Sequence, residues 1–269
     1  MNNNSLKNMA KTILSGFSII GLDLLKLLNS MRGFVPYLSD YSKIKAQLTE
    51  MENDFPLARS FPCLTDRYET NGELEKHYFH QDLFVAQRIL QGSPNRHIDI
   101  GSRVDGFVAH VAVSRKIEVL DIRPMPFSAD NIEFLQCDLM NRIPSSLTEC
   151  CDSLSCLHAL EHFGLGRYGD PIDVNGHLVG FKNLSSMLTS GGTLYISVPI
   201  GEQRIEFNAH RVFSIHYLLN MFDDNFSLKQ FSYINDEGNL LKEVALSDEI
   251  IQRNAGCWYG CGIFELTKN

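Results

Sequence analysis

The sequence has no excess of basic residues. Its 269 residues include 24 Lys and Arg against 32 Asp and Glu, which gives a formal net charge of −8 at pH 7. A protein that binds nucleic acid through a basic face carries the opposite balance, and no run of basic residues substitutes for it here. We therefore expect no nucleic-acid partner.

The sequence also lacks an apolar run long enough to cross a bilayer. The stretch 13–31 is rich in Leu and Ile, but Asp23 and Lys26 interrupt it. It has no basic segment with a small-residue cleavage site, so we expect no secretory signal and a cytoplasmic protein. Apolar residues at helical spacing predict an amphipathic helix instead: Phe17, Ile20, Leu24, Leu27 and Met31. We expect residues 12–32 to pack on the body or self-associate, with peripheral contact at the inner face of the membrane as the alternative.

A paired set of cysteines is absent as well. The seven cysteines are an odd number and lie mostly in apolar contexts, which predicts reduced thiols. Cys257 and Cys261 have the spacing of half a metal site, but no second pair of Cys or His follows at finger-like spacing. We interpret both as core or loop thiols and assign no metal ligands.

What the chain does contain is a change of pattern near residue 95. Residues 1–60 read as helices, residues 61–94 as a loop followed by a helix, and residues 95–269 as alternating strands and helices. The expected strands are 96–100, 116–120, 132–136, 151–157, 193–198, 227–233 and 262–267, and the expected helices are 79–92, 178–188 and 213–222. This alternation predicts an α/β fold with a doubly wound, mainly parallel sheet of seven strands and an N-terminal helical extension.

Polar residues follow the ends of the expected strands, where ligands bind in such sheets. Asp99-x-Gly101 ends the first strand, and a glycine there lets the backbone approach a ligand closely. Asp121 ends the second strand and suits the hydroxyls of a ribose, while Asp138 ends the third and suits an exocyclic amine. The G-x-G-x-x-G pattern is incomplete, since only Gly101 and Gly106 are present, which counts against a nicotinamide-dependent oxidoreductase.

These strand ends resemble the class I S-adenosylmethionine-dependent methyltransferases over roughly residues 95–269. The resemblance rests on Asp99-x-Gly101, Asp121, Cys137-Asp138-Leu139 and the stretch 157–162 (LHALEH). The stretches HYFHQDL and LEHFGLGRYGDPID look closer to a bacterial branch associated with surface-polysaccharide gene clusters. The family fold ends in a reversed strand, which we expect at residues 260–269 as an antiparallel edge.

The resemblance implies S-adenosyl-L-methionine as the cofactor and a set of residues around it. These are Asp99, Gly101, Ser102, Asp121, Ile122, Cys137, Asp138, Leu139, Leu157 and, from the helix before the first strand, Gln81. Arg103 and Asp105 depart from the glycine-rich loop of the family, because small residues are common at their positions. A loop closed by a salt bridge between them is the alternative.

The stretch His158-Ala159-Leu160-Glu161-His162 also fits H-x-x-E-H, a zinc-peptidase pattern. A metal-dependent hydrolase would need His158 and His162 one helical turn apart on a rigid helix. An apolar strand precedes this stretch and Gly164 follows it closely, so we expect a loop without that pair.

In a methyltransferase this segment faces the acceptor. We expect His162, His210 and Glu161 as catalytic residues, because an imidazole near neutral pKa suits removal of a hydroxyl proton. The substrate contacts expected in the same region are Arg167, Tyr168, Asp170 and Arg211. The expected reaction is O-methylation of a sugar, polysaccharide or lipopolysaccharide precursor, with a small molecule or glycan as acceptor. The alternatives are a protein that binds the cofactor without turnover and a metal ion held by His158, His162 and His210 that acidifies the acceptor.

Overall fold

The computed structural model describes residues 21–50, 55, 57–69 and 76–269 of the chain. The chain divides into two compact units, Met1–Glu73 and Leu74–Asn269. The first part of the amphipathic segment expected at 12–32, up to residue 20, lies outside the described residues.

The first unit contains the long helix α2 (Leu24–Glu50) and a segment that returns along it through a 3-10 turn, η1 (Asp66–Tyr68). Pro36 lies inside α2 and has no N–H to bond the carbonyl of Arg32. The hydroxyl of Tyr68 donates to that carbonyl instead, at 3.2 Å. The returning segment therefore supplies the hydrogen bond that the proline removes. Among the helices that the structure describes, none combines the length and apolarity needed to cross a membrane.

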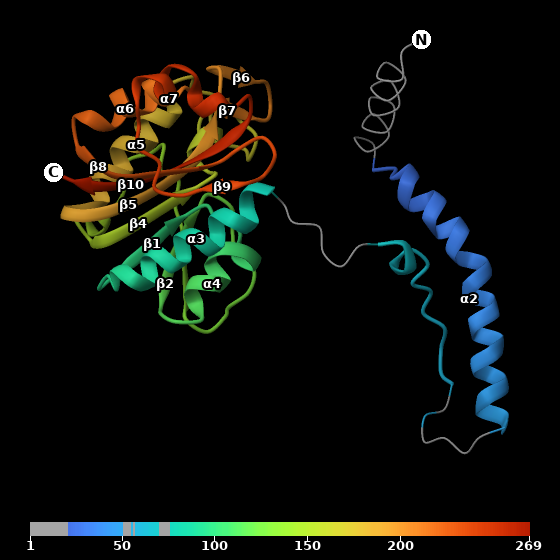
Figure 1. Cartoon of the computed structure of the whole chain (residues 1–269). Coiled ribbons are helices and arrows are strands. Elements are labelled where there is room, and N and C mark those ends of the chain that lie inside the picture. Colours follow the sequence, from blue (N-terminus) through green and yellow to red (C-terminus); the bar gives the residue numbers. More distant parts are fainter. Residues whose placement is uncertain (1–20, 51–54, 56, 70–75) are drawn as a thin grey trace, which may run out of the picture. The chain divides into compact units, whose positions relative to one another are not determined.

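The second unit is built on one eight-stranded sheet in the order β3-β2-β1-β4-β5-β10-β8-β9 (Figure 1). The strands are β1 (His97–Ile100), β2 (Ile117–Asp121), β3 (Ile132–Gln136), β4 (Cys151–Leu157), β5 (Leu188–Ile200), β8 (Phe226–Ile234), β9 (Leu240–Leu241) and β10 (Gly260–Lys268). Strands β1 to β5 are parallel, and β10 is antiparallel to both of its neighbours. The sheet therefore has the mainly parallel, doubly wound form expected from the sequence.

Two features of the sheet differ from expectation. We expected the final strand at an edge, but β10 lies between β5 and β8. Its first seven residues are buried, which requires a neighbour on each side and helices on both faces. The short strand β9 adds an edge to the seven expected strands. A separate hairpin of two three-residue strands, β6 (Arg204–Glu206) and β7 (His210–Val212), was too short to leave an apolar pattern in the sequence.

Helices cover both faces of the sheet (Figure 1). On one face, α3 (Lys76–Gly92) and α4 (Ala109–Ala112) pack through Val85, Ile89 and Val111. On the other, α5 (Gly176–Met187) and α6 (Ile215–Asp223) bury residues such as Leu184. The remaining helical elements are the π-turn η2 (Val104–Val108), the short helix α7 (Asp248–Gln252) and the 3-10 turns η3 (Ser145–Leu147), η4 (Leu160–His162) and η5 (Asn254–Gly256). Because both faces are covered, open ligand sites are left at the strand ends.

Candidate active site

A cavity lies at the carboxyl ends of β1, β2, β3 and β4. It is lined by Ile100, Gly101, Leu120, Asp121, Ile122, Arg123, Cys137, Asp138, Leu139, Met140, His158, Ala159, His162, Phe163, Tyr168 and Asp170. Six of the ten expected cofactor residues are among them: Gly101, Asp121, Ile122, Cys137, Asp138 and Leu139. The other four, Asp99, Ser102, Leu157 and Gln81, lie outside this lining.

Asp99 lies beneath the cavity, where it organises the loop after β1. It is fully buried; Oδ1 accepts from the hydroxyls of Ser102 at 2.8 Å and Ser155 at 2.5 Å, and Oδ2 accepts from the backbone N–H of Ser102 at 3.0 Å. Burial raises the pKa of Asp99 to about 6, against the lowering effect of these hydrogen bonds. Asp99 and Ser102 thus form a support for the loop rather than an exposed ligand contact.

Gly101 brings the backbone of the loop after β1 to the wall of the cavity. Its φ is +73°, a left-handed conformation, and a Cβ at this position would lie 3.1 Å from the Cβ of Ala159. Both restrictions favour glycine at this position. In the same loop, Arg103 and Asp105 form the alternative salt bridge, with Nη2 and Oδ2 at 3.1 Å.

Asp121 is held by an arginine that the sequence analysis did not single out. Arg123 donates from Nε to Oδ1 at 3.0 Å and from Nη2 to Oδ2 at 2.6 Å, and its guanidinium lies 4.6 Å from the ring centroid of Tyr168. The Asp121 hydrogen bond raises the pKa of Arg123 above its ordinary value, so the group is charged. A ribose diol at Asp121 would have to share or displace this arginine.

Asp138 shapes the turn after β3. Its Oδ1 accepts from the N–H of Met140 at 2.9 Å and its Oδ2 from the amide of Asn141 at 2.7 Å. A carboxylate has about four lone-pair sites, so each oxygen retains capacity for one further donor from the cavity.

Gln81 is not at the cavity, contrary to expectation. Its side chain is 1% exposed, its Nε2 donates to Asp82 at 3.0 Å, and its Oε1 accepts from Ser197 at 2.5 Å. The face of α3 that carries Gln81 packs on the sheet, so the Gln81 amide forms its hydrogen bonds within the core. Leu157, 2% exposed, belongs to the same apolar cluster as α3.

The segment after β4 gathers histidines around a buried carboxylate. Glu161 is 1% exposed; its Oε1 lies 2.8 Å from Nδ1 of His158 and 3.8 Å from Nε2 of His162. Burial favours the neutral form of Glu161, but the neighbouring His158 outweighs it and lowers the pKa of Glu161. For His158, burial is outweighed by Cys261 and Glu161, which raise its pKa to about 10.

This geometry argues against the zinc-peptidase interpretation. His158 has a φ of +49°, and residues 160–162 form a 3-10 turn instead of a helix. Nδ1 of His158 is turned to Glu161, so the two histidines flank the carboxylate instead of facing a shared ion on one side of a helix.

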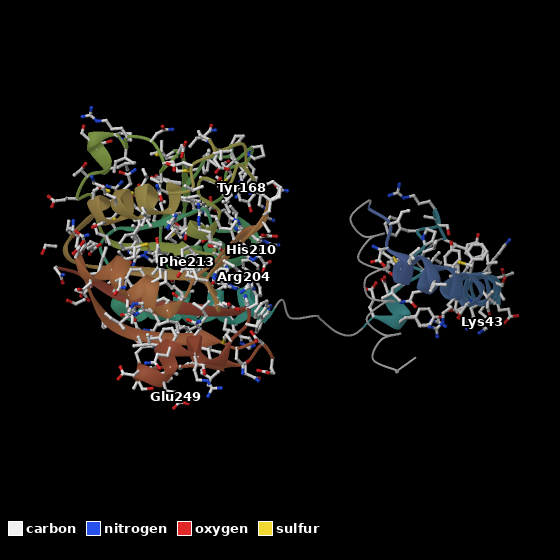
Figure 2. All side chains as sticks on the ribbon, turned by 90° about the horizontal axis from the view of Figure 1, so that it is seen from above. Lys43, Tyr168, Arg204, His210, Phe213 and Glu249 are labelled. Carbon is white, nitrogen blue, oxygen red and sulfur yellow. The ribbon has the colours of Figure 1, made fainter. Side chains whose placement is uncertain are left out.

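His162 faces the cavity with a defined tautomer. Its Nδ1 lies 2.7 Å from the carbonyl oxygen of Ala209, which can only accept a hydrogen bond. Burial lowers the pKa of His162 below its ordinary value, with Glu161 opposing, and so favours the neutral ring. His210, from β7, lies 6.3 Å away between ring centroids, and burial lowers its pKa as well. Tyr168 contacts His162 edge-on at 5.4 Å, and Tyr168 and His210 lie at one end of the second unit (Figure 2).

The four expected substrate residues divide into two groups. Tyr168 lines the cavity, and Arg167 lies over its ring, 5.3 Å from the centroid, with Nη1 donating to Ala209. Asp170 also borders the cavity, but its carboxylate accepts from the backbone of Gly164, Gly166 and Tyr168 and so holds the loop.

Arg211 is not placed to contact a substrate, which corrects the expectation. It is 4% exposed, and its guanidinium donates to the carbonyls of Glu161, Phe163 and Val174 at 3.3, 2.6 and 3.0 Å. Its donors face inward because the loop 161–174 turns its carbonyls toward β7. Arg211 therefore ties the loop 161–174 to this hairpin.

Sequence reasoning missed several residues at this site. Arg123 stands two residues after Asp121, and that short spacing was an available signal for a pair. Met140 and Phe163 gave none, since isolated apolar loop residues carry no periodicity. His77 stacks on His158 with ring centroids 5.4 Å apart, although the residues are 81 positions apart in the chain.

The order and direction of the strands define the fold. Parallel strands in the order β3-β2-β1-β4-β5, followed by an antiparallel β10 inserted before β8, form the Rossmann-like fold of class I methyltransferases. Among solved structures, the chain is similar to the 1,6-didemethyltoxoflavin-N1-methyltransferase of Burkholderia thailandensis, bound to 1,6-didemethyltoxoflavin and S-adenosylhomocysteine. The TM-score is 0.50 with 12% identity, over 72% of this chain and 80% of that one. It also matches the N-methyltransferase NodS of Bradyrhizobium japonicum WM9 in complex with S-adenosylhomocysteine, at a TM-score of 0.47 and 14% identity, over 72% and 87% of the two chains.

The sequence of the chain matches one protein family. Residues 120–254, half of the chain, match the family described as "Caenorhabditis protein of unknown function, DUF268", and the chain belongs to this family. A comparison with the curated proteins gives no match. The matched segment contains most of the cavity lining, from Leu120 through the His158–Asp170 segment.

Proposed function

We propose that the protein is an S-adenosylmethionine-dependent methyltransferase. The observation that carries this proposal is the meeting of Asp121 and Asp138 in one cavity at the carboxyl ends of β2 and β3. A carboxylate after the second strand suits a ribose diol, and one after the third suits an adenine amine. The bound S-adenosylhomocysteine of the Burkholderia enzyme, which shares the fold, supports the same cofactor for this chain.

The acceptor is proposed to be a hydroxyl of a small molecule or glycan, such as a sugar or polysaccharide precursor. Methyl transfer to oxygen breaks the bond from sulfonium sulfur to methyl carbon, forms a bond from carbon to oxygen, and releases the hydroxyl proton to a base. His162 lines the cavity and its burial favours the neutral ring, which suits it to take that proton. Arg167 and Tyr168 at the same end offer polar and ring contacts to a polyol.

The cofactor proposal is tested by calorimetric titration with S-adenosylhomocysteine, using metal-stripped protein and NAD as the control ligand. Micromolar binding that weakens strongly in Asp121→Ala supports the site. A folded protein that binds neither ligand would contradict the proposal. Turnover is then measured with nucleotide sugars and glycans as acceptors.

The second candidate is a protein that binds the cofactor without turnover. It is favoured by Arg123, which occupies both oxygens of Asp121, and by the incomplete glycine pattern of the loop after β1. This candidate predicts S-adenosylhomocysteine binding that His162→Gln and His210→Gln leave unchanged, with no methyl transfer to any acceptor.

We also propose that α2 mediates self-association or peripheral membrane contact. Its exposed apolar residues support this: Leu25, Leu27, Leu28, Met31, Phe34, Val35, Leu38 and Ile44 are each 48–72% exposed. Light scattering and vesicle flotation of the full chain, compared with Leu28→Glu and Val35→Glu variants, distinguish the two modes.

A further inference from the structure

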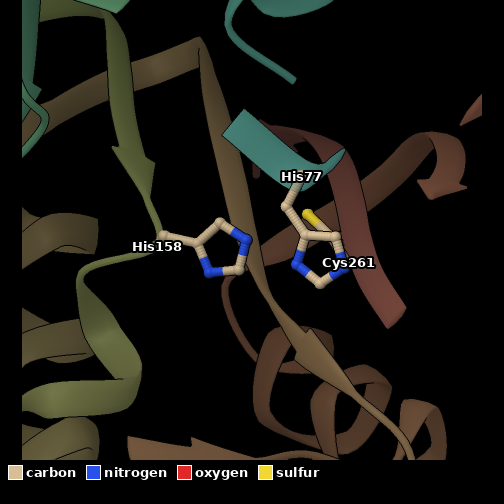
Figure 3. Close-up of side chains that lie close together, drawn as sticks. All are labelled: His77, His158 and Cys261. Atoms are coloured by element: carbon tan, nitrogen blue, oxygen red, sulfur yellow. The ribbon is translucent and has the colours of Figure 1, made fainter. Parts of the chain in front are cut away.

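His77, His158 and Cys261 meet in the second unit from three separate parts of the chain (Figure 3). His77 comes from the first turn of α3, His158 follows β4, and Cys261 lies in β10. One ring nitrogen of each histidine and the Cys261 sulfur all lie within 4.8 Å of one another. His158 and Cys261 are buried, and His77 is partly buried.

Glu161 fixes the orientation of the central histidine. The Nδ1–H of His158 donates to Oε1 of Glu161 at 2.8 Å, and the Glu161 carboxylate is itself buried. Metal-binding histidines commonly donate their second ring N–H to a carboxylate in this way, which sets the tautomer and makes the ring a better ligand. The contact therefore leaves Nε2 of His158 as the group available for a ligand.

The remaining nitrogen of His158 has no hydrogen-bond partner. Nε2 is buried, in a side chain that is 4% exposed, and is unsatisfied in the structure. A buried polar atom left unsatisfied is costly, so such atoms call for a ligand, an ion or a water. His77 stacks on the His158 ring at 5.4 Å, and Tyr259 stacks on His77.

We propose that His77, His158 and Cys261 form a transition-metal site that is distinct from the cofactor contacts. Bond lengths of about 2.0–2.1 Å to nitrogen and 2.3 Å to sulfur place the ligand atoms of tetrahedral zinc roughly 3.3–3.8 Å apart. The three atoms here need to close by about 1 Å, which side-chain rotation supplies. Binding leaves a thiolate at Cys261 and a neutral imidazole at His158, and it releases to solvent the protons that the sulfur and Nε2 of His158 carry.

The ligand set selects the metal. Two imidazoles and one thiolate suit Zn²⁺, whereas Mg²⁺ and Ca²⁺ require oxygen ligands. Three protein ligands leave the fourth tetrahedral position for water or another small ligand, the arrangement of open zinc sites. His158 also lines the cavity, so the ion would lie against its wall.

The first experiment titrates the metal-stripped full chain with Zn²⁺ by calorimetry and with Co²⁺ by absorption spectroscopy. We expect one Zn²⁺ per chain, and a Co²⁺ complex with tetrahedral d–d bands and a thiolate-to-metal charge-transfer band. X-ray absorption of the zinc form of the wild-type chain should count one sulfur and two imidazole ligands. This measurement needs no variant, so it remains decisive if a substitution prevents folding.

Variants identify the ligands. Cys261→Ser should abolish the charge-transfer band, and His77→Ala and His158→Ala should each weaken Zn²⁺ binding. Glu161→Gln should weaken it by roughly 10–100-fold, the usual effect of losing a carboxylate behind a ligand histidine. The matched controls are Cys63→Ser and His216→Ala, which remove an exposed thiol and an exposed imidazole outside the group.

Three results would overturn the site. They are a folded chain that binds no Zn²⁺, a Co²⁺ complex without a thiolate band, and a Zn²⁺ affinity that Cys261→Ser leaves unchanged. Titration of Cys261→Ser with S-adenosylhomocysteine separates this site from the proposed cofactor site, because Cys261 does not line the cavity. Loss of zinc with retained cofactor binding supports two independent sites.

Discussion

The contact between His162 and the carbonyl of Ala209 determines which nitrogen of this imidazole carries the proton. The distance of 2.7 Å from Nδ1 to the carbonyl oxygen places the proton on Nδ1, so Nε2 of the neutral ring carries the lone pair. The groups near this ring are Glu161, Arg167, His158 and His210. Burial has the largest effect and lowers the His162 pKa below its ordinary value of 6.5, although Glu161 raises it.

The first prediction concerns the pH profile of methyl transfer. A base works when neutral, so activity falls as pH drops through the His162 pKa, and the acid limb of kcat should lie below pH 6.5. His162→Gln should lower kcat by about 10²–10⁴-fold, the usual contribution of a general base, and remove this limb. His216→Gln, at an exposed position, is the control. An unchanged kcat in His162→Gln would show that proximity alone drives the reaction.

The second prediction concerns the opposite effects of Asp121 and Arg123 on cofactor binding. Asp121→Ala should weaken S-adenosylhomocysteine binding by about 10- to 150-fold, because a hydrogen bond to a charged group contributes about 1.5–3 kcal/mol. Arg123→Ala should tighten binding by up to about fivefold. The pair is exposed on the arginine side, at 51%, and such pairs contribute about 0–1 kcal/mol, so freeing Asp121 removes a weak competitor. Calorimetry measures both constants. Equal losses in the two variants would instead make Arg123 a ligand contact.

The third prediction concerns acid stability through His97. This ring is 1% exposed and lies between the hydroxyls of Ser153 at 2.8 Å and Ser155 at 3.2 Å. Burial, helped by Arg115, lowers its pKa from 6.5 to about 3. In the unfolded chain His97 is protonated near pH 6.5, whereas in the folded chain it is protonated only near pH 3. Lowering the pH from about 6.5 to about 3 therefore reduces the free energy of unfolding.

His97→Gln keeps a hydrogen-bonding side chain but removes the titration. The Tm advantage of the wild type over this variant should shrink as pH falls from 7 to 4. Thermal unfolding followed by circular dichroism at several pH values gives the comparison. A difference in Tm that stays constant across this range would mean that the pKa of His97 is the same in the folded and unfolded chain, which would contradict the prediction.

The fourth prediction concerns Arg211. Arg211→Met leaves the carbonyls of Glu161, Phe163 and Val174 without this donor and should lower the free energy of unfolding by about 1–3 kcal/mol. Arg211→Lys should recover only part of this, because an ammonium cannot reproduce the planar fork. Arg253→Met is the matched control: its side chain is 71% exposed, and the expected change is within about 0.5 kcal/mol. Urea denaturation measures all three, and a similar result for Arg211→Met and Arg253→Met would contradict the role of Arg211.

The sequence predicted the sheet because its strands are continuous apolar runs that end at a polar residue or glycine. Strands 132–136 and 151–157 match β3 and β4, and Asp121 and Asp138 fall at one cavity as the strand-end rule requires. The insertion of β10 was missed, since a strand's neighbours are set by packing across the sheet and leave no local pattern.

The details of the site depend on contacts between distant residues. His77, His158 and Cys261 share no spacing that a sequence reader can detect, and their meeting follows from where α3 and β10 pack. The inward orientation of Arg211 and Gln81 depends on which face of an element is buried, and a polar residue in a short element does not reveal that face.

The position of β10 also affects the order in which the strands can pair during synthesis. Each of the strands β2 to β5 follows in the chain the parallel strand on which it pairs, so these strands can pair in the order in which they are synthesised. Strand β8 has no place beside β5 until residues 260–268 emerge, because β10 lies between them. The same strand delivers Cys261, so a nascent chain lacking β10 would hold the Asp121 cavity strands but not the thiol. Closure of the sheet and completion of the proposed metal ligand set would then be a single, late event.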